Sequence, residues 1–212
     1  MPKDPFPFPN ELYPKEWFAR LDRREIFDDA RRSGEERPED RPIELDLGSG
    51  DGSFLVRMAK ELPDRDFLGV ERLLGRVRKT CRKAARLDLS NVRVLRTDSN
   101  YAVEWLLPRG FARRIHFLCP DPWPKKKHAS RRQMCRLDFL GHLHSLLEEG
   151  GELLFKTDSS DYFAEALEVQ ADCDFFVREP WEDDDFFYAE SDFERQWLAE
   201  GRSMHRLRLR KT

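Results

Sequence analysis

The sequence predicts an α/β fold with a doubly wound, mostly parallel sheet of seven strands and an antiparallel edge strand. Short apolar runs alternate with amphipathic stretches from residue 43 onward, as in consecutive βαβ units. A glycine-rich turn joins the first apolar run to the first amphipathic stretch, where α/β proteins bind ligands. The last run, Met204–Arg210, alternates leucines with charged residues, which is typical of an antiparallel strand.

The individual elements follow from this periodicity. Strands are predicted at residues 43–47, 66–70, 92–96, 115–118, 152–156, 175–178 and 204–210. Helices are predicted at residues 54–62, 73–87, 101–107, 130–147 and 162–171, and Gly150-Gly151 is expected to end the longest of them.

The N-terminal segment differs in composition from the rest of the chain. Prolines occur at positions 2, 5, 7, 9 and 14, with Phe6 and Phe8 between them, which favours an extended arm, either disordered or lying over a site. Residues 16–32 suggest one or two helical turns, and residues 33–42 are polar and rich in helix breakers. We therefore expect an arm and short helical segment over residues 1–42 and one globular domain over residues 43–212.

Composition excludes several classes of protein. The 212 residues contain four cysteines without a Cys-x-x-Cys spacing, which argues against a zinc knuckle or a disulfide framework. His142 and His144 would lie on different faces of a helix, so no metal site is expected. No apolar run is long enough to span a bilayer, and no signal core is present, so we expect a cytoplasmic protein.

The glycine-rich turn reads Asp46-Leu47-Gly48-Ser49-Gly50-Asp51-Gly52. Glycines at Gly48 and Gly50 allow the backbone to approach a ligand closely. The sixth position counted from Gly48 is Ser53, so the dinucleotide pattern Gly-x-Gly-x-x-Gly is incomplete and a nicotinamide oxidoreductase is disfavoured. The spacing resembles that of class I S-adenosylmethionine methyltransferases, although a tight turn without a ligand has the same composition.

Acidic residues occur at the ends of three successive predicted strands: Asp46, Glu71 and Asp98. The carboxyl ends of parallel strands share one edge of a sheet, so these side chains are expected to converge. Glu71 would accept hydrogen bonds from two ribose hydroxyls, Asp98 would face an adenine amino group, and Asp46 would lie near an ammonium group. A single acid in such a place is more often a solvated residue or a helix N-cap.

A proline-rich corner follows the predicted strand at residues 115–118. Three prolines surround Asp121 and Trp123, and the next eight residues, 125–132, contain five Lys or Arg residues and no acid. Such a block is compatible with nucleic acid despite the formal net charge of −3. The alternative is a strand end followed by a solvated helix face. Trp123 would either stack on an RNA base or close the core, and the sequence favours neither.

Taken together, these motifs resemble the bacterial tRNA (guanine-N7-)-methyltransferase family, also written as the TrmB family. The matching segments occur in order, and Pro-Asp-Pro-Trp-Pro-Lys-Lys is the most specific: residues 46–52, 69–71, 120–126, 155–158 and 191–194. The resemblance covers about residues 43–210. It implies a Rossmann-like class I fold and transfer of a methyl group from S-adenosylmethionine to N7 of a guanine in the tRNA variable loop.

The resemblance also implies roles for individual residues, with Asp121 as the catalytic position. The cofactor-binding set is Asp46, Gly48, Gly50, Glu71, Asp98 and Asp121. The substrate guanosine falls to Lys125, Asp158, Ser191, Asp192, Phe193 and Glu194. The RNA-binding set is Lys126, Lys127, His128, Arg131 and Arg132.

Four positions depart from the family pattern. Asp46 stands where Glu is usual, and Ser191 stands where Thr is usual and keeps the hydroxyl. Lys127 replaces the usual Arg and Ser130 the usual Lys, so the basic segment loses a guanidinium and a charge. Phosphate affinity is the property that these changes affect most.

The chemistry constrains the mechanism independently of the resemblance. Guanine N7 carries an in-plane lone pair, so its methylation requires alignment and charge stabilisation but no prior deprotonation. Asp121 would stabilise the cationic product, and Asp158 or Glu194 would accept hydrogen bonds from guanine N1 and N2. Two alternatives stay open: a methyltransferase of another acceptor, and a non-catalytic RNA-binding module. Monomer and homodimer are equally compatible with the sequence.

Overall fold

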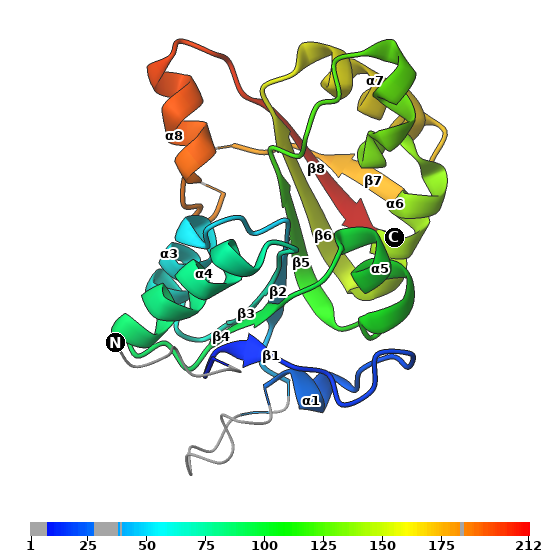
Figure 1. Cartoon of the computed structure of the whole chain (residues 1–212). Helices are drawn as coiled ribbons and strands as arrows, with labels where there is room; N and C mark the ends of the chain where they lie inside the picture. The colour runs from blue at the N-terminus through cyan, green and yellow to red at the C-terminus, as the bar shows by residue number, and fades with distance from the viewer. Residues whose placement is uncertain (1–7, 28–37, 39, 183–184) are drawn as a thin grey trace. The chain divides into compact units, whose positions relative to one another are not determined.

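A computed structural model describes residues 8–27, 38, 40–182 and 185–212, excluding the side chains of Lys126 and Ala129. The chain divides into two compact units, residues 1–108 and 109–212, which are described separately below. Figure 1 labels the helices and strands along the chain.

The first unit is built on parallel strands in the order β1-β4-β3-β2. The strands are β1 (Glu11–Leu12), β2 (Ile43–Leu47), β3 (Asp66–Val70) and β4 (Val92–Leu95). The helices are α1 (Arg23–Ile26), α3 (Ser53–Glu61), α4 (Leu74–Arg86), α5 (Ser99–Tyr101) and the π-helical turn η1 (Ala102–Leu106). All residues of β2, β3 and β4 are buried, as expected for parallel strands covered on both faces.

Strand β1 is the element that the sequence did not predict in this unit, and it makes eight described strands where seven were expected. Glu11 and Leu12 pair with Val94 and Leu95 of β4. The Asn10 side chain donates hydrogen bonds to the carbonyls of Leu89 and Val92, at 3.0 and 3.1 Å. The described end of the proline-rich arm is therefore part of the first unit, whereas residues 1–7 and most of the expected linker lie outside the described residues. The domain boundary at residue 43 stays a prediction.

The second unit has the strand order β5-β6-β8-β7. The strands are β5 (Ala112–Leu118), β6 (Leu147–Thr157), β7 (Phe176–Glu179) and β8 (His205–Lys211). The helices are α6 (Leu137–Leu146), α7 (Ser160–Ala171) and α8 (Asp192–Ala199), preceded by the 3-10 turns η2 (Lys126–Arg131) and η3 (Gln133–Cys135). Strand β5 is parallel to β6, and β8 is antiparallel to both β6 and β7.

The prediction that the last strand forms the edge is wrong, because β8 lies between β6 and β7. Its alternation is real, since Leu207 and Leu209 are buried and Arg208 and Arg210 are more exposed. The alternation of apolar and charged residues shows which face of a strand is covered, but it does not show which strands pair with it. The short β7 is the outermost strand of this unit.

The predicted helix at residues 130–147 is also shorter than expected. The Met134 N–H donates to the Tyr162 hydroxyl at 3.1 Å, a tertiary partner in place of a helical carbonyl. The backbone of Arg136 is extended, so α6 begins only at Leu137. Leu147 already pairs with Ala112 of β5, and Gly150-Gly151 therefore lies inside β6 and does not end the helix.

A close contact between Gly52 and Thr80 leads to a stability prediction. Gly52 has φ +75°, and a Cβ there would lie 2.3 Å from the Thr80 Cγ2 atom. We expect Gly52→Ala to lower the free energy of unfolding by about 2 to 5 kcal/mol, from left-handed strain plus overpacking. Gly48→Ala is the matched control, because φ is +77° there and a Cβ would meet nothing within 4 Å.

Urea denaturation of the ligand-free variants measures this difference. The control should lose about 1 to 2 kcal/mol, the cost of positive φ alone. Equal losses in the two variants would show that the contact with Thr80 relaxes freely.

Candidate active site

The glycine turn, residues 48–52, folds back onto the end of β3 in the first unit. The N–H groups of Gly48 and Ser49 donate to the Val70 carbonyl at 2.9 and 3.0 Å, and the Gly50 N–H donates to Glu71 Oε2 at 3.1 Å. Gly48 and Gly50 both have positive φ angles, 77° and 58°. The predicted residues Asp46, Gly48, Gly50 and Glu71 are thereby brought together.

Two buried carboxylates lie beside this turn. Burial, reinforced by the neighbouring charge of Glu71, raises the pKa of Asp46 to about 8. Glu71 also accepts a hydrogen bond from the Leu73 N–H at 2.7 Å, and Arg76 Nη1 lies 3.6 Å from its Oε2 atom. A cationic ligand group beside Asp46 would offset the free-energy cost of burying the negative charge of the Asp46 carboxylate.

Space next to the turn is compatible with a ligand. A Cβ built on Gly48 meets nothing within 4 Å, and one on Gly50 meets only the Gly48 carbonyl, at 3.9 Å. The buried Ser49 hydroxyl has no hydrogen-bond partner among the described residues. The first unit could therefore hold a nucleoside cofactor that carries a positive charge.

Asp98 lies at the same edge, because Leu95 of β4 pairs with Val70 of β3. Its Oδ1 atom accepts hydrogen bonds from the N–H groups of Asn100 and Tyr101, at 2.9 and 3.4 Å, and caps α5. The side chain is exposed. Asp98 therefore has the N-cap role that the sequence offered as an alternative, and its contact with adenine stays a prediction.

In the second unit, the proline corner, residues 119–124, has a strained backbone. Cys119 and Trp123 have φ angles of 51° and 43°, which cost about 1 to 3 kcal/mol each and cluster at functional sites. The Cys119 N–H donates to the Lys156 carbonyl at 2.8 Å, which anchors the corner to β6. Asp121 is exposed between the two strained residues.

The basic segment, residues 125–132, folds back onto Trp123. The Arg131 guanidinium lies 4.7 Å from the centre of the Trp123 ring, and the His128 ring lies 5.9 Å away. The sequence predicts that Trp123 either stacks on an RNA base or closes the core, and neither role includes this contact with the basic segment. Lys125, Lys127 and Arg131 are exposed, as RNA contacts require.

The predicted RNA contact of Arg132 is not supported by its surroundings. Its side chain is buried, its Nε donates to the Pro122 carbonyl at 2.8 Å, and its Nη1 lies 2.6 Å from Glu165 Oε1. Arg132 therefore holds the proline corner in place. The sequence could not distinguish it from Arg131, because adjacent basic residues look alike without knowledge of α7.

A buried ion pair joins β6 to α8. Lys156 Nζ lies 2.5 Å from Glu194 Oε1, and both side chains are buried. The rings of Tyr188 and Trp181 lie 4.1 and 5.2 Å from the ammonium. Lys156 was not predicted as a site residue. A lysine in the otherwise apolar, buried run 153–156 does indicate an ion pair, because a buried charge requires a partner.

Several predicted substrate residues gather around Cys119. Burial raises the pKa of the Cys119 thiol to about 12, and the charges of Glu194 and Asp158 act in the same direction. Ser191 forms a hydrogen bond with this thiol and accepts one from the Glu194 N–H at 3.1 Å, capping α8. The predicted residues Asp158, Ser191 and Glu194 therefore lie together around Cys119, which precedes Asp121 by two residues.

The other two predicted substrate residues of the segment 191–194 face solvent. Asp192 pairs with Arg195, and the exposed Phe193 ring lies 5.7 Å from the Trp197 ring. Asp158 Oδ2 lies 2.9 Å from Arg202 Nη1, and this hydrogen bond raises the pKa of Arg202. Helix α8 was not predicted, although the Ser191-x-x-Glu194 spacing is a helix-start signature.

The described residues contain no group of three or more His, Cys, Asp or Glu side chains placed to hold a metal ion. Within the same residues, no helix has both the length and the apolar character to cross a membrane.

Solved structures with the same architecture define the fold. The 16S rRNA methyltransferase KamB superposes with a TM-score of 0.63 at 16% identity, covering 88% of this chain and 93% of that chain. The aminoglycoside resistance methyltransferase NpmB1 has a TM-score of 0.59 at 20% identity, covering 91% and 95%. The protein has the Rossmann-like class I methyltransferase fold.

Sequence comparisons place the chain more narrowly. A family described as "Putative methyltransferase" matches residues 40–207. The tRNA (guanine-N(7)-)-methyltransferase of Syntrophotalea carbinolica is 34% identical over 168 residues, 77% of this chain and 72% of the relative. That of Geobacter metallireducens is 30% identical over 175 residues, 81% of this chain and 82% of the relative. The chain belongs to this methyltransferase family.

Relatives differ in length. The tRNA (guanine-N(7)-)-methyltransferase of Thermotoga maritima is 33% identical over 160 residues. This match covers 76% of the present chain but only 51% of the relative.

Proposed function

We propose that this protein is a tRNA (guanine-N7-)-methyltransferase, which transfers a methyl group from S-adenosylmethionine to N7 of a guanine in the tRNA variable loop. The observation that carries the proposal is the gathering of Asp158, Ser191 and Glu194 around Cys119, beside the proline corner that presents Asp121. The names of the relatives support the same substrate. A protein with this proposed activity would act on tRNA in the cytoplasm.

The residues of the first unit fit the cofactor. When bound, S-adenosylmethionine supplies an activated methyl group on a sulfonium. Asp46 would face its ammonium group, Glu71 and Asp98 would bind the adenosine part, and the open space at Gly48 leaves room for a ligand against the backbone. The Glu71 bonds to the Gly50 and Leu73 N–H groups keep this carboxylate oriented before binding.

The residues of the second unit suit a purine that needs no deprotonation. Guanine N7 attacks with its own lone pair, so these side chains orient the base and stabilise charge. Asp121 offers a carboxylate for the cationic product, and a preorganised charge of this kind is worth about 3 to 4 kcal/mol of the barrier. Asp158 and Glu194 offer acceptors to the Watson–Crick edge, and Lys125 is exposed for contact with the nucleotide.

Nucleoside mass spectrometry tests the proposal. Unmodified tRNA is incubated with the protein and S-adenosylmethionine, digested, and analysed for N7-methylguanosine. A tRNA with adenosine at the target position is the control and should give no product. Failure to methylate the guanosine-containing tRNA would overturn the proposal. Calorimetry with the cofactor would then separate a methyltransferase of another acceptor from a protein that binds RNA only.

The exposed basic side chains lead to a prediction about RNA affinity. Replacing Lys127 and Arg131 together with alanine should weaken tRNA binding and reduce the slope of log K against log salt by roughly 1.4 to 1.8, because each phosphate contact contributes about 0.7 to 0.9. Arg178→Ala, at an exposed position on β7, is the control and should leave the slope unchanged. Filter binding between 50 and 200 mM salt, roughly the range over which such contacts are resolved, measures the slope. An unchanged slope in the double variant would remove these residues from the RNA contact.

A further inference from the structure

The Lys156–Glu194 pair leaves one carboxylate oxygen unused. Lys156 Nζ contacts Oε1 of Glu194, at 2.5 Å. The Oε2 atom is buried and has no hydrogen-bond partner among the described residues. A buried, unpaired anionic oxygen is costly, so its persistence indicates an acceptor kept for a ligand.

Two aromatic rings flank the ammonium group of Lys156. The ammonium lies 4.1 Å from the centre of the Tyr188 ring and 5.2 Å from that of Trp181. Ring faces attract the cation, and the single bond to Oε1 completes its described contacts. The positive charge of Lys156 therefore offsets the negative charge of Glu194 while Oε2 stays unoccupied.

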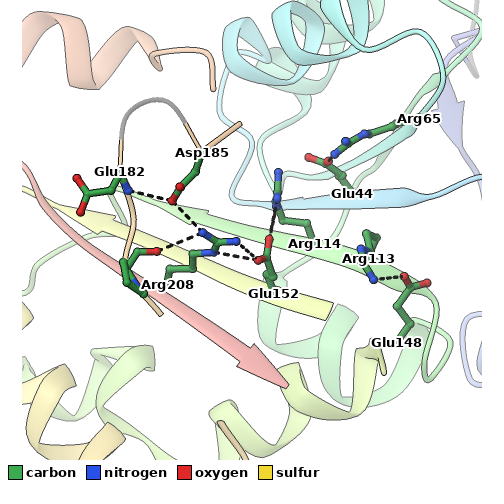
Figure 2. Close-up of polar contacts among 10 residues, drawn as sticks. Glu44, Arg65, Arg113, Arg114, Glu148, Glu152, Glu182, Asp185 and Arg208 are labelled. Carbon is green, nitrogen blue, oxygen red and sulfur yellow. Dashed lines mark hydrogen bonds and ion pairs between the residues drawn. The ribbon is translucent and has the colours of Figure 1, made fainter. Parts of the chain in front are cut away.

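Both rings belong to the ring loop, described over residues 180–182 and 185–188, and Glu152 anchors this loop to the sheet. Figure 2 shows the Glu152 carboxylate between Arg114 and Arg208. Arg208 Nη1 continues to the Pro180 carbonyl at 3.2 Å and to Asp185 Oδ2 at 3.0 Å. Burial acts to raise the pKa of Glu152, but the charges and hydrogen bonds of Arg114 and Arg208 hold it below its ordinary value.

The anchor also reaches the aromatic part of the ring loop. The Arg114 guanidinium lies 3.9 Å from the centre of the Phe186 ring, and Phe186 lies 6.0 Å from Trp181, centre to centre. Glu152, through its two arginines, therefore fixes the segment that carries the rings around Lys156.

We propose that Lys156 is a positioning residue that determines base specificity: it holds Oε1 of Glu194 and leaves Oε2 to accept a hydrogen bond from the 2-amino group of a guanine. The inference rests on the proposed function. A carboxylate accepts hydrogen bonds and donates none, so it selects a purine with a donor at this edge. Without the ammonium, Oε1 loses the contact that orients the Glu194 carboxylate, so Oε2 is no longer held toward the 2-amino group and the selection is lost.

The test compares guanosine with inosine, which lacks the 2-amino group, at the target position of the tRNA. The wild type should prefer guanosine in kcat/KM by roughly tenfold to a hundredfold, the value of one hydrogen bond to a charged group. Lys156→Met should bring this ratio close to one, and Lys156→Arg should restore most of it. Lys211→Met is the matched control, because Lys211, on the neighbouring β8, pairs with the exposed Glu149 at 3.1 Å.

A merely structural role for Lys156 would lower both rates together and keep their ratio. Equal wild-type rates for the two substrates, or an unchanged ratio in Lys156→Met, would overturn the inference. Binding of guanosine and inosine monophosphates to the same variants is measured in parallel by calorimetry. If the wild type forms no N7-methylguanosine, the proposed function fails, whereas a binding preference that Lys156→Met abolishes still supports the role of Lys156.

Discussion

Asp121→Ala is expected to lower kcat by about 10²- to 10³-fold while tRNA affinity changes by no more than about twofold. The side chain is exposed at the proline corner, and the strained residues Cys119 and Trp123 flank it. A charge held in place before reaction stabilises the cationic product without reorganisation. The loss should therefore appear in turnover, because Asp121 lies outside the basic segment, residues 125–132, that we propose contacts phosphate.

Single-turnover kinetics and filter binding separate these two quantities. Asp121→Asn keeps the shape of the side chain and removes its charge, so it should lose nearly as much turnover as Asp121→Ala. Asp172→Ala removes an exposed carboxylate at the end of α7 and should behave as the wild type. Near-normal turnover in Asp121→Ala would exclude a catalytic role, and a large loss of tRNA affinity would place Asp121 in RNA binding.

Asp46→Asn is expected to make the ligand-free protein more stable at pH 8 while weakening cofactor binding at least tenfold. The pKa of Asp46 is raised from 3.8 to about 8, first by burial and then by Glu71. Between these values the folded protein holds a proton that the unfolded chain has released. Wild-type stability therefore falls as the pH rises through this window, by up to about 1.4 kcal/mol per pH unit.

Urea denaturation from pH 5 to pH 8 reveals this slope, which Asp46→Asn should remove. Asp51→Asn is the control, because burial acts to raise the pKa of Asp51 but hydrogen bonds from Lys83 and Ser53 lower it overall. Its contribution changes only below about pH 4, the ordinary range for an aspartate, so the slope above pH 5 should persist. A wild-type stability that is flat over this range would contradict the raised pKa of Asp46.

The first unit was largely predictable because its signals are local. Strands β2 and β3 match the predicted residues 43–47 and 66–70, and the glycine turn joins β2 to α3 as expected. The convergence of Asp46 and Glu71 follows from parallel pairing, in which Leu47 lies opposite Val70. Element type, turn position and the edge that carries the acids can all be read from neighbouring residues.

The second unit depends on contacts between residues far apart in the chain. Lys156 and Glu194 are 38 residues apart, and no local pattern predicts that a buried strand lysine meets the first turn of α8. Arg131 and Arg132 are adjacent, yet only Arg132 is buried, where it contacts Glu165 and the Pro122 carbonyl. Likewise, the alternating pattern of β8 does not predict its place between β6 and β7.

The amino-acid sequence by itself determined the α/β class, the glycine turn, the acids at the strand ends and the chemical character of the proline corner, because periodicity and turn chemistry act over a few residues. Only the tertiary structure decided which charges are buried and with which partners, as in the Lys156–Glu194 pair inside its aromatic rings. The physical reason is that desolvation and ion pairing depend on three-dimensional neighbours that separate segments supply.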